Sequence, residues 1–173
     1  FLMLTGASGD GKSSLIYAGI IPNARSGFLK SKYTQWCVAD FRPERSPFHN
    51  LCKSLGKQLD IADIYTVESE LNHGFSALVD LYRNSKRFLD TQSESWLTAD
   101  EKQKGAIRRE AANLIILVDQ FEEFFTNPEN YQHGVPSTEA SLVLNLLLEP
   151  ARIALEEDLP IYVVFTMRSD YIG

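Results

Sequence analysis

Hydrophobic residues gather in four short runs along the chain, and polar segments with apolar positions at helical spacing separate these runs. The runs occupy residues 1–5, 35–41, 114–118 and 161–166. Apolar runs of this length that end at turn or acidic residues are typical of buried strands. Strands that alternate with helices predict an α/β domain, with a parallel sheet and right-handed crossover connections.

A proline marks one boundary of each of two predicted helices. Residues 12–21 form a helix-like set that we expect to stop before Pro22, because the residue preceding a proline disfavours helical geometry. Ser46 and Pro47 begin the next helix, with serine at the cap and proline at the first position. The apolar positions of this second helix continue at helical spacing to Leu59.

The remaining segments have more varied patterns. Residues 137–157 predict a long helix that Pro150 should kink or split in two. Apolar residues between positions 75 and 89 suggest a further helix. Residues 84–112 are polar and mixed in charge, and we expect them to form an extended helical or loop insertion. The insertion would belong to a single domain that spans residues 1–173.

Composition and charge exclude several classes of function. Lys and Arg number 17 and Asp and Glu number 23, which gives a net charge of −6, and no basic cluster exceeds two residues. Nucleic-acid binding by the whole surface is therefore disfavoured. The longest aliphatic run, at 114–118, is too short for a membrane-spanning helix. The two cysteines lack CxxC spacing, which favours reduced thiols in a cytoplasmic domain over a disulfide framework. The three histidines are scattered and have no partners at metal-ligand spacing, so a zinc site is disfavoured.

The turn after the first run matches the phosphate-binding pattern G-x-x-x-x-G-K-[ST] without a mismatch. Its glycines allow the backbone to curl so that several N–H groups converge on one phosphate. The Lys12 ammonium would reach the β and γ phosphates, and the Ser13 hydroxyl would join the shell of a magnesium ion. The expected nucleotide-binding residues are Gly6, Ala7, Ser8, Gly9, Asp10, Gly11, Lys12, Ser13 and Ser14.

Acidic residues follow the most hydrophobic run. Asp119 ends this run, and because ligands gather at the carboxyl ends of parallel strands, we expect it close to Ser13 as the second magnesium ligand. Glu122 and Glu123 come next, and they offer a base for the attack of water on the γ-phosphate. We favour Glu122 as the water-activating acid and Glu123 as its neighbour in the same catalytic cluster. The alternative is that the pair only solvates the start of a helix.

Arg168 lies at the end of the fourth run. Its planar guanidinium matches phosphate oxygens, so we assign it a γ-phosphate-sensing role on the side of the phosphate opposite Lys12. The alternative is an ordinary surface arginine that pairs with Asp170.

Together these segments resemble the STAND class of P-loop NTPases, and most closely its novel STAND group. The resemblance rests on the phosphate loop, on D-Q-F-E-E at 119–123, on T-M-R-S-D at 166–170 and on F-R-P at 41–43. It covers the chain except for about residues 61–113. It implies a three-layer fold of the ASCE type with strand order 5-1-4-3-2, of which the chain would supply strands 1–4.

The resemblance also implies a function. Such proteins are magnesium-dependent signal-transduction switches that bind and hydrolyse ATP or GTP, and we favour ATP. In the triphosphate form they self-oligomerise, and they carry sensor repeats and an effector domain outside the NTPase core. We therefore expect a fragment of a larger cytoplasmic protein that has no membrane partner, and that binds nucleotide weakly and hydrolyses it slowly in isolation.

Two other functions stay open. One is a different P-loop enzyme, such as a small-molecule kinase whose lid would take Arg108 and Arg109 from the polar insertion. An AAA+-type remodeller is disfavoured, because Gln120 stands where its catalytic glutamate would follow the aspartate. The other is a non-catalytic nucleotide-binding scaffold. Loss of turnover with intact nucleotide binding in a Glu122→Gln variant would favour a hydrolytic switch.

Overall fold

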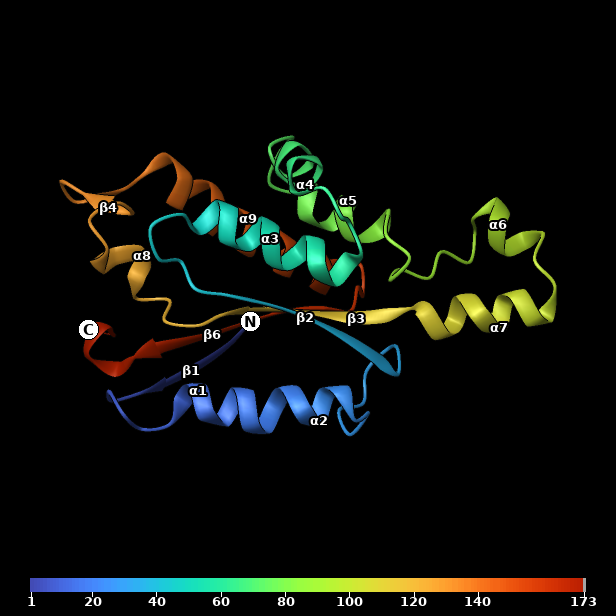
Figure 1. Cartoon of the computed structure of the whole chain (residues 1–173), viewed down its shortest axis with the longest axis horizontal. Helices are drawn as coiled ribbons and strands as arrows, with labels where there is room; N and C mark the ends of the chain where they lie inside the picture. Colours follow the sequence, from blue (N-terminus) through green and yellow to red (C-terminus); the bar gives the residue numbers. More distant parts are fainter. Residues whose placement is uncertain (173) are drawn as a thin grey trace.

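A four-stranded parallel sheet forms the middle of the molecule in a computed structural model that describes residues 1–172. The strand order is β1-β6-β3-β2, which corresponds to 1-4-3-2 when the strands of the sheet are counted along the chain. Helices cover both faces of this sheet (Figure 1). The predicted α/β fold class is therefore confirmed. The strands are β1 (Leu2–Gly6), β2 (Gln35–Phe41), β3 (Ala112–Val118) and β6 (Ile161–Arg168).

The helices are divided unequally between the two faces (Figure 1). One face carries a single continuous run, made of α1 (Lys12–Leu15), the π-helical turn η1 (Ile16–Ile20) and α2 (Ile21–Arg25). The other carries α3 (Pro47–Leu59), α4 (Ile64–Leu71), α5 (Ala77–Arg83) and α9 (Thr138–Glu156). The smaller elements are α6 (Glu94–Leu97), α7 (Glu101–Glu110), α8 (Glu123–Thr126), β4 (Tyr131–Gln132), β5 (Val135–Pro136) and the 3₁₀ turn η2 (Ser169–Tyr171). Among residues 1–172, none of the helices has the length and apolar character that crossing a membrane requires.

Strand β3 lies at the centre of the core, because all seven of its residues are buried. Its side chains point alternately to the two faces of the sheet. Leu114 and Ile116 join the larger hydrophobic cluster with α3, α5 and α9, whereas Ile115 and Leu117 join the smaller cluster beneath α1 and α2. A strand buried on both faces was predicted from the aliphatic run. It places Asp119 directly at the carboxyl edge of the sheet.

Asn113 is a fully buried polar residue inside this strand. Its Oδ1 accepts the Tyr33 N–H at 3.0 Å, and its Nδ2 donates to the carbonyl oxygens of Tyr33 and Gln35 at 2.7 and 3.0 Å. An Asn113→Ala change should lower the free energy of unfolding by about 2–4 kcal/mol, because it leaves buried backbone groups without partners. Urea denaturation measures this loss. Asn23→Ala, which removes one exposed bond to the Gly19 carbonyl, is the control and should change it by less than about 1 kcal/mol.

The first helix differs from its prediction, because it does not stop before Pro22. The helix continues through this proline to Arg25. The π-helical turn at 16–20 directly precedes α2, which begins at Ile21. In this wider turn the Ile21 N–H donates to the Ile16 carbonyl, five residues back. The wider turn leaves room for the proline ring, which would otherwise clash with the preceding turn.

Helix α9 is continuous across Pro150, so of the two expected outcomes, a kink or a split, the split is wrong. A proline in a helix interior costs about 3 kcal/mol. Pro150 itself is buried, and so are Leu146 and Leu147 before it and Ile153 after it. Burial of this apolar face on both sides of the proline outweighs the cost of the lost backbone bond.

Helix α3 begins at Pro47, as predicted, but the Ser46 side chain makes no capping hydrogen bond. Instead, Oε1 of Glu139 on α9 accepts the N–H of Phe48 at 3.0 Å. A carboxylate from a neighbouring helix thus satisfies one of the free N–H groups at the helix start. The contact between Glu139 and the Phe48 N–H depends on the tertiary fold, which the local sequence does not reveal.

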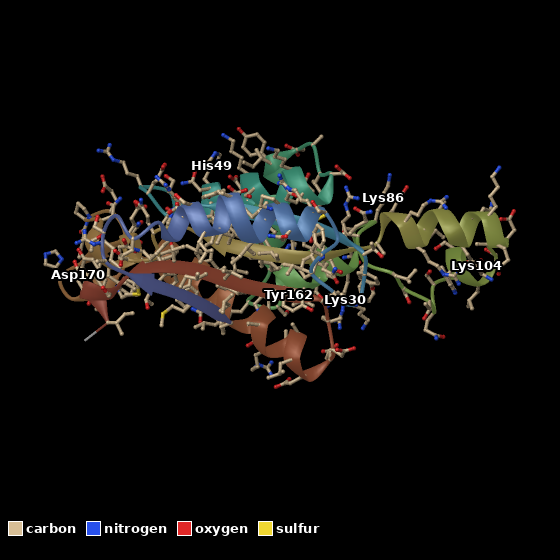
Figure 2. The ribbon with its side chains drawn as sticks, turned by 90° about the horizontal axis from the view of Figure 1, so that it is seen from below. Lys30, His49, Lys86, Lys104, Tyr162 and Asp170 are labelled. Atoms are coloured by element: carbon tan, nitrogen blue, oxygen red, sulfur yellow. The ribbon has the colours of Figure 1, made fainter. Side chains whose placement is uncertain are left out.

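The polar insertion at residues 84–112 forms an arm that extends from the amino ends of the strands (Figure 1). Helix α7 starts with a capping box between Asp100 and Gln103. The Arg108 guanidinium carbon lies 4.9 Å from the centre of the Trp96 ring, which joins α7 to α6. Lys104 on this arm and Asp170 after β6 lie at opposite ends of the molecule (Figure 2).

Candidate functional site

The loop between β1 and α1 curls at the carboxyl edge of the sheet, at the end of the molecule where β6 ends (Figure 1). Gly9 and Gly11 have φ angles of 90° and 76°. A Cβ added to either residue would meet nothing within 4 Å. Glycine is therefore required here by the left-handed backbone conformation and not by close packing.

Two charged side chains hold the shape of this loop. The Asp10 Oδ2 accepts the Ala7 N–H at 2.6 Å across the base of the loop. The Lys12 Nζ donates to the carbonyl oxygens of Gly6 and Ala7 at 2.8 and 2.7 Å. The Lys12 partners are neutral, and charge-assisted bonds to phosphate oxygens are stronger. The ammonium can therefore move to an anion without breaking an ion pair.

An open pocket of about 290 Å³ joins the phosphate loop to the ends of β3 and β6. It brings together most of the loop with Glu122 and Arg168, as well as Gln120 and Thr166, which were not among the expected site residues. Five expected residues do not line it, namely Gly6, Ala7, Asp10, Asp119 and Glu123. Its lining consists of Ser8, Gly9, Gly11, Lys12, Ser13, Ser14, Gln120, Glu122, Thr166 and Arg168.

Asp119 lies fully buried next to this pocket. Its Oδ1 accepts the hydroxyls of Ser13 and Thr166, both at 2.8 Å, and its Oδ2 accepts Nε and Nη2 of Arg42 at 3.0 and 2.8 Å. Burial by itself would raise the pKa of Asp119. The hydrogen bonds from Thr166, Ser13 and Arg42 outweigh burial and hold this pKa below its ordinary value. Asp119 is therefore an anion at neutral pH.

Glu122 and Glu123 point in different directions. Glu122 is only 8% exposed, and its Oε2 is buried without a hydrogen-bond partner within residues 1–172. A buried carboxylate oxygen without a partner is unfavourable, and such atoms need a functional or structural explanation. Glu123 lies outside the pocket, where its Oε2 accepts the Glu44 N–H at 2.8 Å.

The backbone at Gln120 explains why Glu122 faces the loop. Gln120 has a positive φ of 61°, which turns the chain sharply after β3. Its N–H donates to the Thr166 hydroxyl at 2.8 Å, and the Phe121 N–H donates to the Thr166 carbonyl at 2.9 Å. The turn after β3 is thus attached to β6, and this attachment holds Glu122 at the rim of the pocket.

Arg168 lines the pocket, and its guanidinium pairs with Asp170, the partner that the alternative named. Its γ-phosphate-sensing role stays a prediction. Its guanidinium carbon lies 5.5 Å from the centre of the Tyr171 ring. The hydrogen bond and the charge of Arg168 lower the pKa of Asp170. The Arg168 Nε is buried and lacks a partner within residues 1–172, so this guanidinium retains donor capacity.

The residues at this site fit a magnesium ion held together with phosphates. Ser13 and Asp119 supply a hydroxyl and a carboxylate oxygen, which are ligands that hard cations prefer. Residues 1–172 contain no group of three or more His, Cys, Asp or Glu that could hold a metal by itself. Magnesium bound with nucleotides takes its remaining ligands from phosphate oxygens and water, so it needs no such protein cage.

Comparison with known proteins adds a family match. The model of the family described as Novel STAND NTPase 1 matches residues 1–173, the whole chain. No curated protein and no solved structure matches the chain. The family match includes residues 61–113, for which the sequence patterns carried no resemblance.

Proposed function

The chain belongs to the novel STAND NTPase 1 family, and we propose that its pocket binds ATP with Mg²⁺ and hydrolyses it as the switch of a signalling protein. One observation carries the proposal. Lys12, Glu122 and Arg168 come from three distant segments of the chain, and all three line one pocket beside the buried Asp119. A cation, an unpaired carboxylate and a second cation around a phosphate loop suit the hydrolysis of a terminal phosphate.

In this proposal the loop binds the nucleotide phosphates through backbone N–H groups, and Lys12 moves from the Gly6 and Ala7 carbonyls to the β and γ phosphates. Ser13 and Asp119 would hold the magnesium ion, Ser13 by its hydroxyl. When bound, the ion neutralises negative charge that develops on the phosphate oxygens. The Thr166 hydroxyl keeps Asp119 oriented, because it donates to the same carboxylate oxygen as Ser13.

Glu122 serves as the base that takes a proton from the attacking water. Two observations support this role: Glu122 lines the pocket, and its buried Oε2 has no hydrogen-bond donor within residues 1–172. A water placed beside the γ-phosphate would supply the missing donor. Arg168 senses the γ-phosphate from the opposite side, with Asp170 as its partner when the phosphate is absent. Glu123 supports the site from outside, through its bond to the Glu44 backbone.

The family resemblance extends the proposal beyond the pocket. Exchange between the diphosphate and triphosphate forms would control self-oligomerisation in the cytoplasm. Sensor repeats and an effector domain in other parts of a longer protein would supply the trigger and the output. These roles follow from the family and are not encoded in the geometry of the pocket.

The placement of the polar arm favours a hydrolytic switch over a small-molecule kinase. Arg108 and Arg109 lie on α7, at the end of the molecule opposite the phosphate loop (Figure 1). Arg108 is held over the Trp96 ring, so it does not reach a phosphate in the pocket. The non-catalytic scaffold is disfavoured by the buried Oε2 of Glu122, which has no partner within residues 1–172.

Thermal unfolding with nucleotide tests the binding step. A ligand at 100 times its Kd adds about 2.7 kcal/mol of stability, which raises the Tm of a chain of this size by about 5–10 °C. We expect this shift with ATP and Mg²⁺, and a smaller shift with GTP. Adenosine, which has no phosphates, is the control and should give no shift. The proposal is wrong if neither ATP nor GTP shifts the Tm at millimolar concentration.

A further inference from the structure

All acceptor positions of Asp119 are filled by donors of the protein itself. A carboxylate accepts about four hydrogen bonds. Oδ1 of Asp119 receives the Ser13 and Thr166 hydroxyls, and Oδ2 receives two N–H groups of the Arg42 guanidinium. A magnesium ion, or a water molecule bound to it, can therefore reach this carboxylate only if one donor leaves.

Arg42 is the donor that can leave most easily. Its side chain is 46% exposed, whereas that of Asp119 is 1% exposed. Water can solvate a released guanidinium at this position, whereas Thr166 is only 1% exposed. Arg42 is also the only cation among these donors, so a second cation near Oδ2 would repel it.

We propose that Arg42 is a tethered cation that competes with magnesium for Asp119, so that binding of metal and nucleotide displaces it. This inference rests on the proposed function, because it assigns a means of regulation to the same site. Arg42 stabilises Asp119 as an anion when no metal is bound, and it thereby raises the magnesium concentration that the site requires. It is a positioning residue and not a catalytic one, since it acts through Asp119.

The connection from β2 to α3 links Arg42 to the segment that directly follows Glu122. Arg42 starts this connection, and Glu44 within it has a positive φ of 48°. The Glu44 N–H donates to the Glu123 Oε2, and its carbonyl accepts the side-chain amides of Asn127 and Asn130, both at 2.7 Å. A shift of Arg42 would therefore reach the segment that directly follows Glu122.

The decisive experiment compares Arg42→Met with Arg45→Met in the full chain. A magnesium titration at fixed concentration of a fluorescent, non-hydrolysable ATP analogue gives the half-saturating magnesium concentration. For Arg42→Met we expect this concentration to fall by about tenfold, because one competing charge is removed. The Tm in EDTA should also fall, because a buried carboxylate loses its cation.

Arg45 is the matched control, because it lies in the same connection and its side chain is 83% exposed. Within residues 1–172 its one salt bridge is to Glu129 at 3.5 Å. The Arg45→Met change should leave the magnesium titration unaltered. An unchanged or higher half-saturating concentration in Arg42→Met overturns the inference and leaves the proposed function intact. If the wild-type chain binds no nucleotide, the proposed function fails instead.

A measurement on the wild type covers the case in which Arg42→Met does not fold. The Nε–H group of Arg42 donates to the buried Asp119, so its NMR signal should be protected from exchange in EDTA. The signal is assigned to Arg42 by its absence from the spectrum of an Arg42→Lys variant, which has no guanidinium at this position. We expect magnesium with the ATP analogue to abolish the protection. Retention of the protected signal at saturation would contradict displacement.

Discussion

Replacement of Lys12 by alanine should lower the affinity for Mg²⁺–ATP by about 100-fold or more. Within residues 1–172 the Lys12 ammonium bonds only to the carbonyls of Gly6 and Ala7, across the loop. Transfer of the ammonium to phosphate oxygens makes charge-assisted bonds, which contribute about 1.5–3 kcal/mol each. Alanine removes these bonds and the positive charge that opposes the triphosphate. Isothermal titration with a non-hydrolysable ATP analogue measures the loss.

Lys102→Ala is the control for this change, because Lys102 is an exposed lysine on α7 at the opposite end of the molecule. It should bind the analogue as tightly as the wild type. Both variants should unfold close to the wild-type Tm without nucleotide, since within residues 1–172 the Lys12 side chain bonds only to two backbone carbonyls of a surface loop. If the Lys12→Ala variant still bound nucleotide with wild-type affinity, the assignment of this loop as the phosphate-binding element would be wrong.

The phosphate loop and the four strands of the parallel sheet were predictable because both are local patterns. The loop is a contiguous pattern of eight residues, and the bounds of β2 match the second hydrophobic run. The approach of Ser13 to Asp119, which are 106 positions apart, was expected from the rule that parallel strands end at one edge. A general property of parallel sheets therefore linked two distant residues.

Three features could not be predicted, because each depends on side-chain direction or on contacts between distant segments. Arg42 reaches Asp119 only because β2 pairs with β3 in register, with Phe41 opposite Val118. The F-R-P segment was visible in the sequence, but its partner was not. The different directions of Glu122 and Glu123 depend on the positive φ of Gln120. The helix through Pro22 depends on a π-helical turn that no periodicity indicated.

The second large effect concerns hydrolysis, where a Glu122→Gln change should lower the turnover number by roughly 10²–10⁴-fold. The amide has the shape of the carboxylate but cannot accept the proton of the attacking water. Affinity for Mg²⁺–ATP should stay within about twofold, because Glu122 makes no contact that the phosphates need. The free energy of unfolding should change little, since the Oε2 atom that the change replaces has no partner to lose within residues 1–172. Single-turnover phosphate release measures the rate.

Glu123→Gln is the matched control, since it makes the same chemical change one position away. The carbonyl oxygen of the new side-chain amide would still accept the Glu44 N–H, so the connection between β2 and α3 stays in place. Turnover should fall by less than about tenfold. If Glu123→Gln lost turnover while Glu122→Gln stayed active, Glu123 would be the base and Glu122 its neighbour. If both variants bind ATP and keep wild-type turnover, neither acid is the base, and the buried Glu122 oxygen needs another explanation.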